Sequence, residues 1–318
     1  MALFASPKLA LKRGALLTAA NWQVVVLQWV ADSVFTALLA VPVVGGAALV
    51  VLTSDLAPQD LFDQGLRRAV PAVAAALLAH PIALAAFLAA MLVVLLGGAL
   101  FMAFVKGGTI AVLALAEGEA GPIEHPPLHL SAVGRTGRFR LETATAGAQR
   151  LFGRFARLGV GLFVAYGLIG TASLATVVSL GTPDSAWDAA RIFAVTVAVI
   201  VAVTVVNLLY LLMQIAVAVD DCDAGTAVAR TTAFLVRRPC EVGIVFGVVS
   251  TLVALGTAAS FLATAALGLI AFVPFVGLAA LPLQVGAWMV RGLVFQFLGL
   301  TALVAYLRLY REGGGTGA

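Results

Sequence analysis

The side chains best suited to chemistry in this sequence gather in one polar stretch between residues 117 and 129. They combine carboxylates with imidazoles, a ligand mixture that zinc accepts: Glu117, Glu119, Glu124, His125 and His129. Pro126 and Pro127 separate the two histidines, so these cannot lie one turn apart on a helix, and no HExxH pattern is present. We therefore expect no metal ion and no cofactor, and interpret the stretch as a solvated loop; zinc binding is the alternative.

A second acidic cluster consists of Asp220, Asp221 and Asp223. Carboxylates attract hard cations, but this cluster directly precedes a predicted helix at 224–238. Asp223 is well placed to cap that helix, which explains the cluster without a metal. No nucleophile elbow, phosphate-binding loop or dinucleotide fingerprint occurs in a suitable context. We expect no catalytic residues and a protein that is not an enzyme.

Polar side chains inside apolar runs are the best candidates for a functional site. Thr204, Asn207, Tyr210 and Gln214 follow steps of three and four and therefore share one helix face. Asp32 is ionisable, and such a residue deep in a membrane usually faces other helices. If Asp32 lies within the membrane, we expect it to contact Asn207 or Gln214. In the alternative, residues 14–30 lie flat on the membrane and Asp32 only marks the start of a span.

The composition places these residues in a membrane. Apolar residues make up 62% of the 318 positions and charged residues 11%, against about a half and about a quarter in a soluble domain. A spanning helix needs about 20 predominantly apolar residues. We predict an all-α fold in a single transmembrane domain, 1–318, with six spans: 22–52, 82–105, 158–180, 192–219, 242–270 and 285–307.

The last span has to include a charged residue. Its apolar run is short, so it must begin near Val285 and contain Arg291. Pro274, Gly277 and Pro282 are then expected to form the turn before it, because proline disfavours a helix interior. A separate seventh span over 271–290 is the alternative.

The distribution of basic residues predicts the orientation. Cytoplasmic ends of spans retain Lys and Arg, and 15 of the 19 basic residues fall on the side of the N-terminus. They are Lys8, Lys12, Arg13, Lys106, Arg135, Arg138, Arg140, Arg150, Arg154, Arg157, Arg230, Arg237, Arg238, Arg308 and Arg311. We predict that both termini are cytoplasmic, with a surface helix at 60–79 outside and a flexible tail at 312–318.

Two cytoplasmic surface helices are expected. The loop 106–157 should contain one at 139–157, where apolar residues recur at helical spacing and Arg150, Arg154 and Arg157 line another face. We expect it to lie on the lipid surface, with its arginines among anionic headgroups; docking of its apolar face on the spans is the alternative. The second is the elbow helix at 224–238.

A small-residue step marks the fifth span. Gly243 and Gly247 form a GxxxG pattern, with Ser250 and Ala254 on the same face. Such steps let helices approach closely. We therefore predict tight packing of this face against another helix.

The segment AVAVDDCDAGTAVARTTAFLVRRP, residues 216–239, resembles the cytoplasmic elbow of uncharacterised multi-span bacterial proteins. These include the membrane domains joined to some glycerophosphodiester phosphodiesterases. The resemblance covers about 60 residues, counting the approach to span three, and implies a shared architecture only. This chain offers no segment for a phosphodiesterase barrel.

Three classes of function remain open. The favoured class is a non-enzymatic integral membrane component, such as a scaffold, assembly factor or accessory subunit, in the bacterial cytoplasmic membrane. Its expected partners are anionic membrane lipids and a protein or second copy of the chain, with no nucleic acid. The alternatives are a transporter or channel subunit for a small solute or lipid, and a lipid-modifying enzyme.

Overall fold

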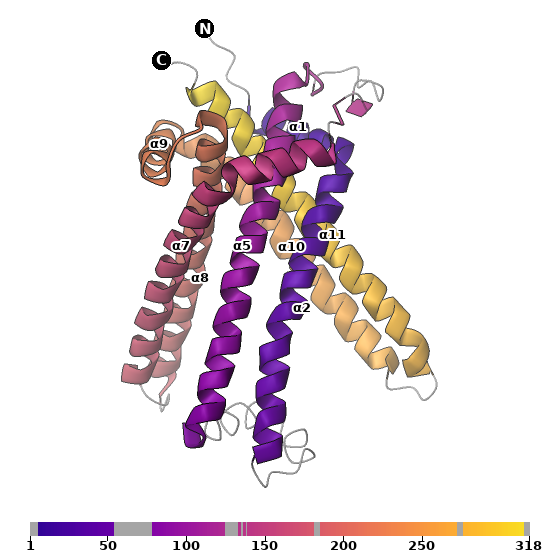
Figure 1. Cartoon of the computed structure of the whole chain (residues 1–318). Helices are drawn as coiled ribbons and strands as arrows, with labels where there is room; N and C mark the ends of the chain where they lie inside the picture. The colour runs from indigo at the N-terminus through magenta and orange to yellow at the C-terminus, as the bar shows by residue number, and fades with distance from the viewer. Residues whose placement is uncertain are drawn as a thin grey trace. The chain divides into compact units, whose positions relative to one another are not determined.

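The computed structural model describes residues 6–53, 78–124, 133–134, 136–137, 139–180, 185–271 and 276–314. Every regular element in those ranges is a helix (Figure 1). In chain order they are α1 (Pro7–Ala20), α2 (Trp22–Thr53), α5 (Pro81–Glu119), α7 (Leu141–Leu180), α8 (Ala186–Asp220), α9 (Ala224–Arg237), α10 (Pro239–Ala271) and α11 (Val276–Gly314).

Six of the helices are long and apolar enough to cross a membrane. The qualifying stretches are Trp22–Gly46, Pro81–Glu119, Leu141–Ser179, Ala186–Asp220, Pro239–Gly268 and Pro282–Gly313. The predicted all-α fold with six candidate spans is confirmed.

The outer surfaces of these helices are apolar. Ile82, Val93, Phe261 and Leu262 are each exposed over 70% or more of their surface. Contiguous exposure of large apolar side chains is rare on soluble proteins and marks a surface that another apolar phase covers. The lipid bilayer provides that phase.

The internal contacts divide the chain into two compact units. The first comprises residues 1–29 and 103–318, and the second comprises residues 30–102. In the second unit the later part of α2 and the first part of α5 pack through aromatic rings against glycines. A Cβ added at Gly98 would lie 2.0 Å from the ring of Phe35, and one at Gly46 would lie 2.7 Å from the ring of Phe87.

The core of the first unit lies where surface helices meet the ends of the spans. Its fully buried side chains come from α1, α5, α7, α8 and α11: Leu17, Leu113, Leu151, Phe155, Ile215 and Leu307. Helix α1 packs along α11. The two backbones approach so closely that a Cβ at Gly14 would lie 2.5 Å from the carbonyl oxygen of Thr301. Glycine is therefore required at this crossing.

Helix α7 differs from its prediction. The expected surface helix and third span form one continuous helix from Leu141 to Leu180. Its first part crosses α5 (Figure 1), where a Cβ at Gly108 would lie 2.6 Å from the Ala144 carbonyl oxygen. Leu151 and Phe155 are completely buried. The apolar face therefore docks on protein, and the expectation that it faces lipid is wrong; small residues at the crossing allow the two helices to touch.

Helix α11 also differs from its prediction. It begins at Val276, so Gly277 and Pro282 lie inside it and do not form a turn. In an apolar phase, unpaired backbone groups are costly, which favours continuing the helix past a proline. Because α11 runs unbroken from Val276 to Gly314, residues 276–290 belong to the same helix as the last candidate span, Pro282–Gly313, and form no separate seventh helix.

Three expectations concern the chain between or beyond these helices. The surface helix expected at 60–79 lies outside the described residues, apart from its last two residues. The expected tail at 312–318 is partly wrong, because residues 312–314 belong to α11, and the rest lies outside the described residues. Residues 14–30 form no single flat segment, because α1 ends at Ala20 and α2 begins at Trp22.

Candidate functional site

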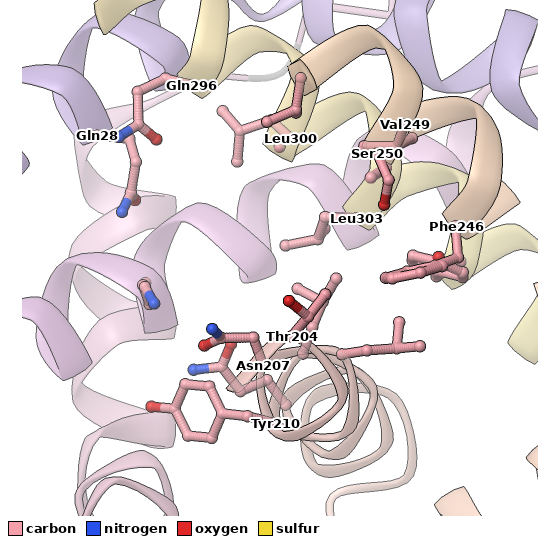
Figure 2. A pocket seen from close by; sticks show the side chains of 18 of the residues that line it. Gln28, Thr204, Asn207, Tyr210, Phe246, Val249, Ser250, Gln296, Leu300 and Leu303 are labelled. Atoms are coloured by element: carbon pink, nitrogen blue, oxygen red, sulfur yellow. The ribbon is translucent and has the colours of Figure 1, made fainter. Parts of the chain in front are cut away.

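A cavity of about 560 Å³ opens among the helices of the first unit (Figure 2). This volume lies within the range of about 300–1,000 Å³ that ligand pockets occupy. Its walls come from α5, α8, α10 and α11, with Gln28 added from the start of α2. It is enclosed by helices from four parts of the first unit and the start of α2.

Helix α8 supplies the polar face that the sequence singled out. Thr204, Asn207, Tyr210 and Gln214 all line the cavity. Asn207 also bonds across helices, because its Oδ1 accepts a hydrogen bond from the Tyr166 hydroxyl of α7 at 2.6 Å. Helical spacing was enough to find these four residues together.

The other helices add polar residues that the sequence analysis missed. Gln28 is 5% exposed, and its Oε1 accepts a hydrogen bond from Thr109 Oγ1 at 3.2 Å. Ser250 of α10 and Gln296 of α11 complete the polar lining (Figure 2). Gln28 and Gln296 also stand in apolar runs, so the rule that selected Asn207 could have found them.

Lys106 is the one charged residue among the described residues that line the cavity. Its Nζ lies 5.4 Å from the centroid of the Tyr210 ring, which is a cation–π distance. By sequence, Lys106 is one of the basic residues that mark the cytoplasmic side. In the structure, the charge of Lys106 on α5 lies beside the polar face of α8.

Gln214 is an almost completely buried lining residue. It is 2% exposed, and its amide lies beside the Tyr210 hydroxyl, the neighbouring acceptor for its Nε2.

Asp32 does not line this cavity. Its side chain is exposed, and its main-chain oxygen accepts a hydrogen bond from the Thr36 hydroxyl at 2.9 Å. Asp32 belongs to the second unit, whereas Asn207 and Gln214 belong to the first. The predicted contact between them stays a prediction.

The small-residue face of α10 is not packed as expected. Among the described residues, nothing lies within 4 Å of a Cβ added at Gly243 or at Gly247. Further along this face, Ser250 and Ala254 line the cavity. Among the described residues, no helix of this chain packs closely on Gly243 or Gly247. Close packing of this face against a helix of another chain stays a prediction.

Two of the candidate zinc ligands, Glu117 and Glu124, form ion pairs with arginines, whereas Glu119 is exposed at the end of α5. Arg13 is 3% exposed, its Nη1 lies 2.7 Å from Glu124 Oε2, and its Nε lies 3.3 Å from Glu117 Oε1. Arg308 and Arg311 also pair with Glu117. Glu117 and Glu124 are both buried, so the solvated-loop interpretation is wrong for them. His125 and His129 lie outside the described residues.

The charge on Glu124 is maintained against burial. Burial raises the pKa of Glu124, but a main-chain hydrogen bond and Arg13 outweigh it and hold the pKa below its ordinary value. Arg13 also donates to the main-chain oxygens of Ala120 and Gly121, both at 2.8 Å. These ion pairs and hydrogen bonds hold α1 against the end of α5, so the cluster stabilises the packing of the two helices.

The acidic cluster at the end of α8 is likewise occupied by protein groups. Asp220 accepts from the Tyr310 hydroxyl and pairs with Arg230, each at 2.6 Å. Asp221, at a φ of 51°, pairs with Arg154 at 2.6 Å, and this guanidinium lowers the pKa of the carboxyl group. Asp223 accepts from the main-chain N–H of Thr226 and caps α9.

Of the three arginines expected at the lipid surface, Arg154 pairs with Asp221, whereas Arg150 and Arg157 are exposed. They occupy the same helix as the docked apolar face, and Arg150 also lines a cavity beside the crossing with α5. Lipid contact by these side chains stays a prediction.

The fold and the cavity define the class: a multi-pass α-helical membrane protein with a ligand-sized, partly polar cavity among its helices. No protein family, curated protein or solved structure matches the chain. The resemblance of residues 216–239 to an elbow of other membrane domains stays a sequence-based expectation.

Proposed function

We propose that this protein is a non-enzymatic integral membrane component that holds a lipid-like amphiphile in its cavity. The cavity carries the proposal, because it joins amide and hydroxyl groups to a wall of aliphatic and aromatic side chains. That apolar wall consists of Leu208, Leu211, Phe246, Val249, Val253, Leu300 and Leu303. A ligand with a polar head and an apolar chain would contact both the polar groups and the apolar wall.

The proposed role needs binding only. An accessory subunit or scaffold would use a bound lipid to fix its helices or its partner.

We place the protein in the bacterial cytoplasmic membrane with both chain ends in the cytoplasm. The 15-to-4 asymmetry of basic residues supports this orientation. The packing of α1 along α11 supports placing both chain ends on one side. Exposed Arg150 and Arg157 would then face the anionic cytoplasmic leaflet, where each basic residue contributes about 1 kcal/mol.

A transporter or channel subunit is the second candidate function. The same cavity supports it, because substrate sites of transporters lie between transmembrane helices. The two candidates predict different rates of lipid transfer between the two leaflets. Reconstituted vesicles that move a lipid analogue between leaflets no faster than protein-free vesicles would favour a holding role.

The test of lipid holding is to fill the cavity. Ala254→Trp puts an indole against the cavity wall, whereas Ala266→Trp adds the same side chain at an exposed position of α10 that does not line the cavity. Native mass spectrometry of the full chain in mild detergent should show loss of a retained lipid only for Ala254→Trp. Equal lipid retention by both variants would contradict the proposal.

A further inference from the structure

Arg291 is a charged residue inside the last candidate span. By sequence it is the sole charged residue between Val276 and Leu307. At a rise of 1.5 Å per residue, it lies about 14 Å along α11 from Pro282 and about 26 Å from Arg308. An isolated charge in hydrocarbon is costly, so an ionisable side chain at such a position usually faces a partner or a polar cavity. Arg291 therefore indicates a functional contact within the membrane.

Arg291 lines a second cavity, of about 800 Å³, to which α10 and α11 contribute all the described lining residues. We call it the α10–α11 cavity. The two helices pack against each other (Figure 1). Most of the α10 wall consists of small residues: Gly256, Ala259, Ser260, Ala263, Thr264 and Gly268. Short side chains leave room for a hydrocarbon chain to lie along the helix beside the arginine.

The charge of Arg291 is not balanced by the described part of the chain. Its side chain is exposed, and its Cζ lies 5.6 Å from the centroid of the Phe295 ring. It forms no ion pair among the described residues, and no carboxylate is among those that line the α10–α11 cavity. A cation–π contact contributes about 0.5–2 kcal/mol, which is less than the cost of burying an unpaired charge in an apolar phase. An oxyanion supplied by a ligand would balance the guanidinium.

The cavity leads from Arg291 toward the ends of the two helices. Gly268 stands near the last residue of α10, and Gln284 stands near the first residues of α11. Side chains of a helix lean toward its N-terminus, so Arg291 leans toward the same end. Gln284 adds a polar amide along this path. A headgroup at that membrane surface and the guanidinium can thus approach each other along the cavity.

We propose that the α10–α11 cavity binds a phospholipid whose phosphate pairs with Arg291 and whose acyl chain lies against the small residues of α10. A guanidinium binds oxyanions through two parallel, charge-assisted hydrogen bonds. The bilayer presents such lipids to an exposed cavity at high local concentration, whereas a partner helix would have to carry a carboxylate at the matching depth. This site is separate from the cavity of the proposed function and does not depend on it.

Native mass spectrometry of the delipidated full-length protein in mild detergent tests the proposal with three probes. They are phosphatidylglycerol, diacylglycerol with the same acyl chains, and inorganic phosphate. Ala263→Trp adds an indole to the cavity wall, whereas Ala266→Trp adds one at an exposed position of α10 that does not line the cavity. Adducts that only Ala263→Trp removes count as binding in this cavity. We expect phosphatidylglycerol to form such adducts, and the other two probes to bind there much more weakly.

Charge variants identify the group responsible. Arg291→Gln should lower the affinity of the cavity for phosphatidylglycerol about tenfold to a hundredfold, as expected for loss of a hydrogen bond to a charged group. Arg291→Lys keeps the charge and should keep the preference over diacylglycerol. Arg191→Gln is the matched control, since Arg191 is an exposed arginine of α8 that pairs with Asp188 and does not line this cavity.

Each contrary result has a definite meaning. Equal binding of phosphatidylglycerol and diacylglycerol in this cavity, or a preference that survives Arg291→Gln, overturns the phosphate assignment; a carboxylate of another helix would then be the remaining partner for Arg291. Inorganic phosphate that binds as tightly as phosphatidylglycerol overturns the lipid. If Arg291→Gln does not purify as a monodisperse protein, Ala263→Trp against Ala266→Trp decides. A lipid adduct that Ala254→Trp removes and Ala263→Trp leaves intact supports the proposed function alone and contradicts this inference.

Discussion

The Nε of Arg13 lies 3.3 Å from Oε1 of Glu117, and both side chains are almost completely buried, at 3% and 2% exposure. The pair joins α1 to the end of α5 across roughly a hundred residues of chain. Arg308 and Arg311 of α11 reach the same carboxylate. Glu117 is therefore the point at which three helices are held together by charge.

Removing the charge of Glu117 should strongly destabilise the protein. Glu117→Gln leaves buried Arg13 without a full counter-charge, and breaking a buried pair from one side costs about 3–5 kcal/mol. Unfolding in a denaturing detergent titration measures the loss. The control is Asp188→Asn, which breaks an exposed pair with Arg191 at 3.8 Å and should change stability by less than about 1 kcal/mol. Equal effects would contradict the structural role of the cluster.

The stability of the α1–α5 junction should fall on acidification. The pKa of Glu124 is held below its ordinary value of 4.5 because its main-chain hydrogen bond and Arg13 outweigh burial. A depressed carboxylate pKa contributes stability above the unfolded-state value, and this contribution is lost as pH falls through the folded-state value. Thermal unfolding between pH 7 and pH 3 measures it. Glu124→Gln should flatten the acid side of the profile, and an unchanged profile would show that this carboxylate does not contribute.

The glycines of the first unit should differ sharply in their tolerance of larger side chains. Gly14→Val forces side-chain atoms into the backbone of α11 at Thr301 and should cost about 1–3 kcal/mol or more. In Gly247→Val the new side chain enters open space. Apart from the change in helix propensity, it should lower the free energy of unfolding by less than about 0.5 kcal/mol. Thermal unfolding of the two variants in the same detergent measures the difference. A large loss at Gly247 would instead indicate that a second chain packs on this face of α10.

The proposed orientation predicts which engineered cysteines are accessible. In a variant lacking Cys222 and Cys240, cysteines at Gly121 and Gly315 should resist a membrane-impermeant thiol reagent in intact cells. Cysteines at Gln59 and Gly181 should react. Both groups should react in inverted vesicles or lysed cells. Labelling of Gly121 from outside would reverse the assignment.

The sequence alone determined the number of long apolar helices and the approximate position of each. Span length and the polar face at Thr204, Asn207, Tyr210 and Gln214 are local properties, because helical periodicity fixes which neighbours share a face. The helix at Ala224–Arg237 is local as well, since a capping aspartate begins it and Pro239 follows its C-cap. No knowledge of other segments is needed for any of these.

Only the tertiary structure decided which polar residues meet. Gln28, Lys106 and Gln214 lie on three helices far apart in sequence, and their convergence depends on how those helices pack. The carboxylates of Glu117 and Glu124 suggested metal ligands because their nearest sequence neighbours are acidic or imidazole groups. Their actual partner, Arg13, lies more than a hundred residues away. Side-chain type and spacing report what a residue can do, whereas long-range packing selects the partner that satisfies it.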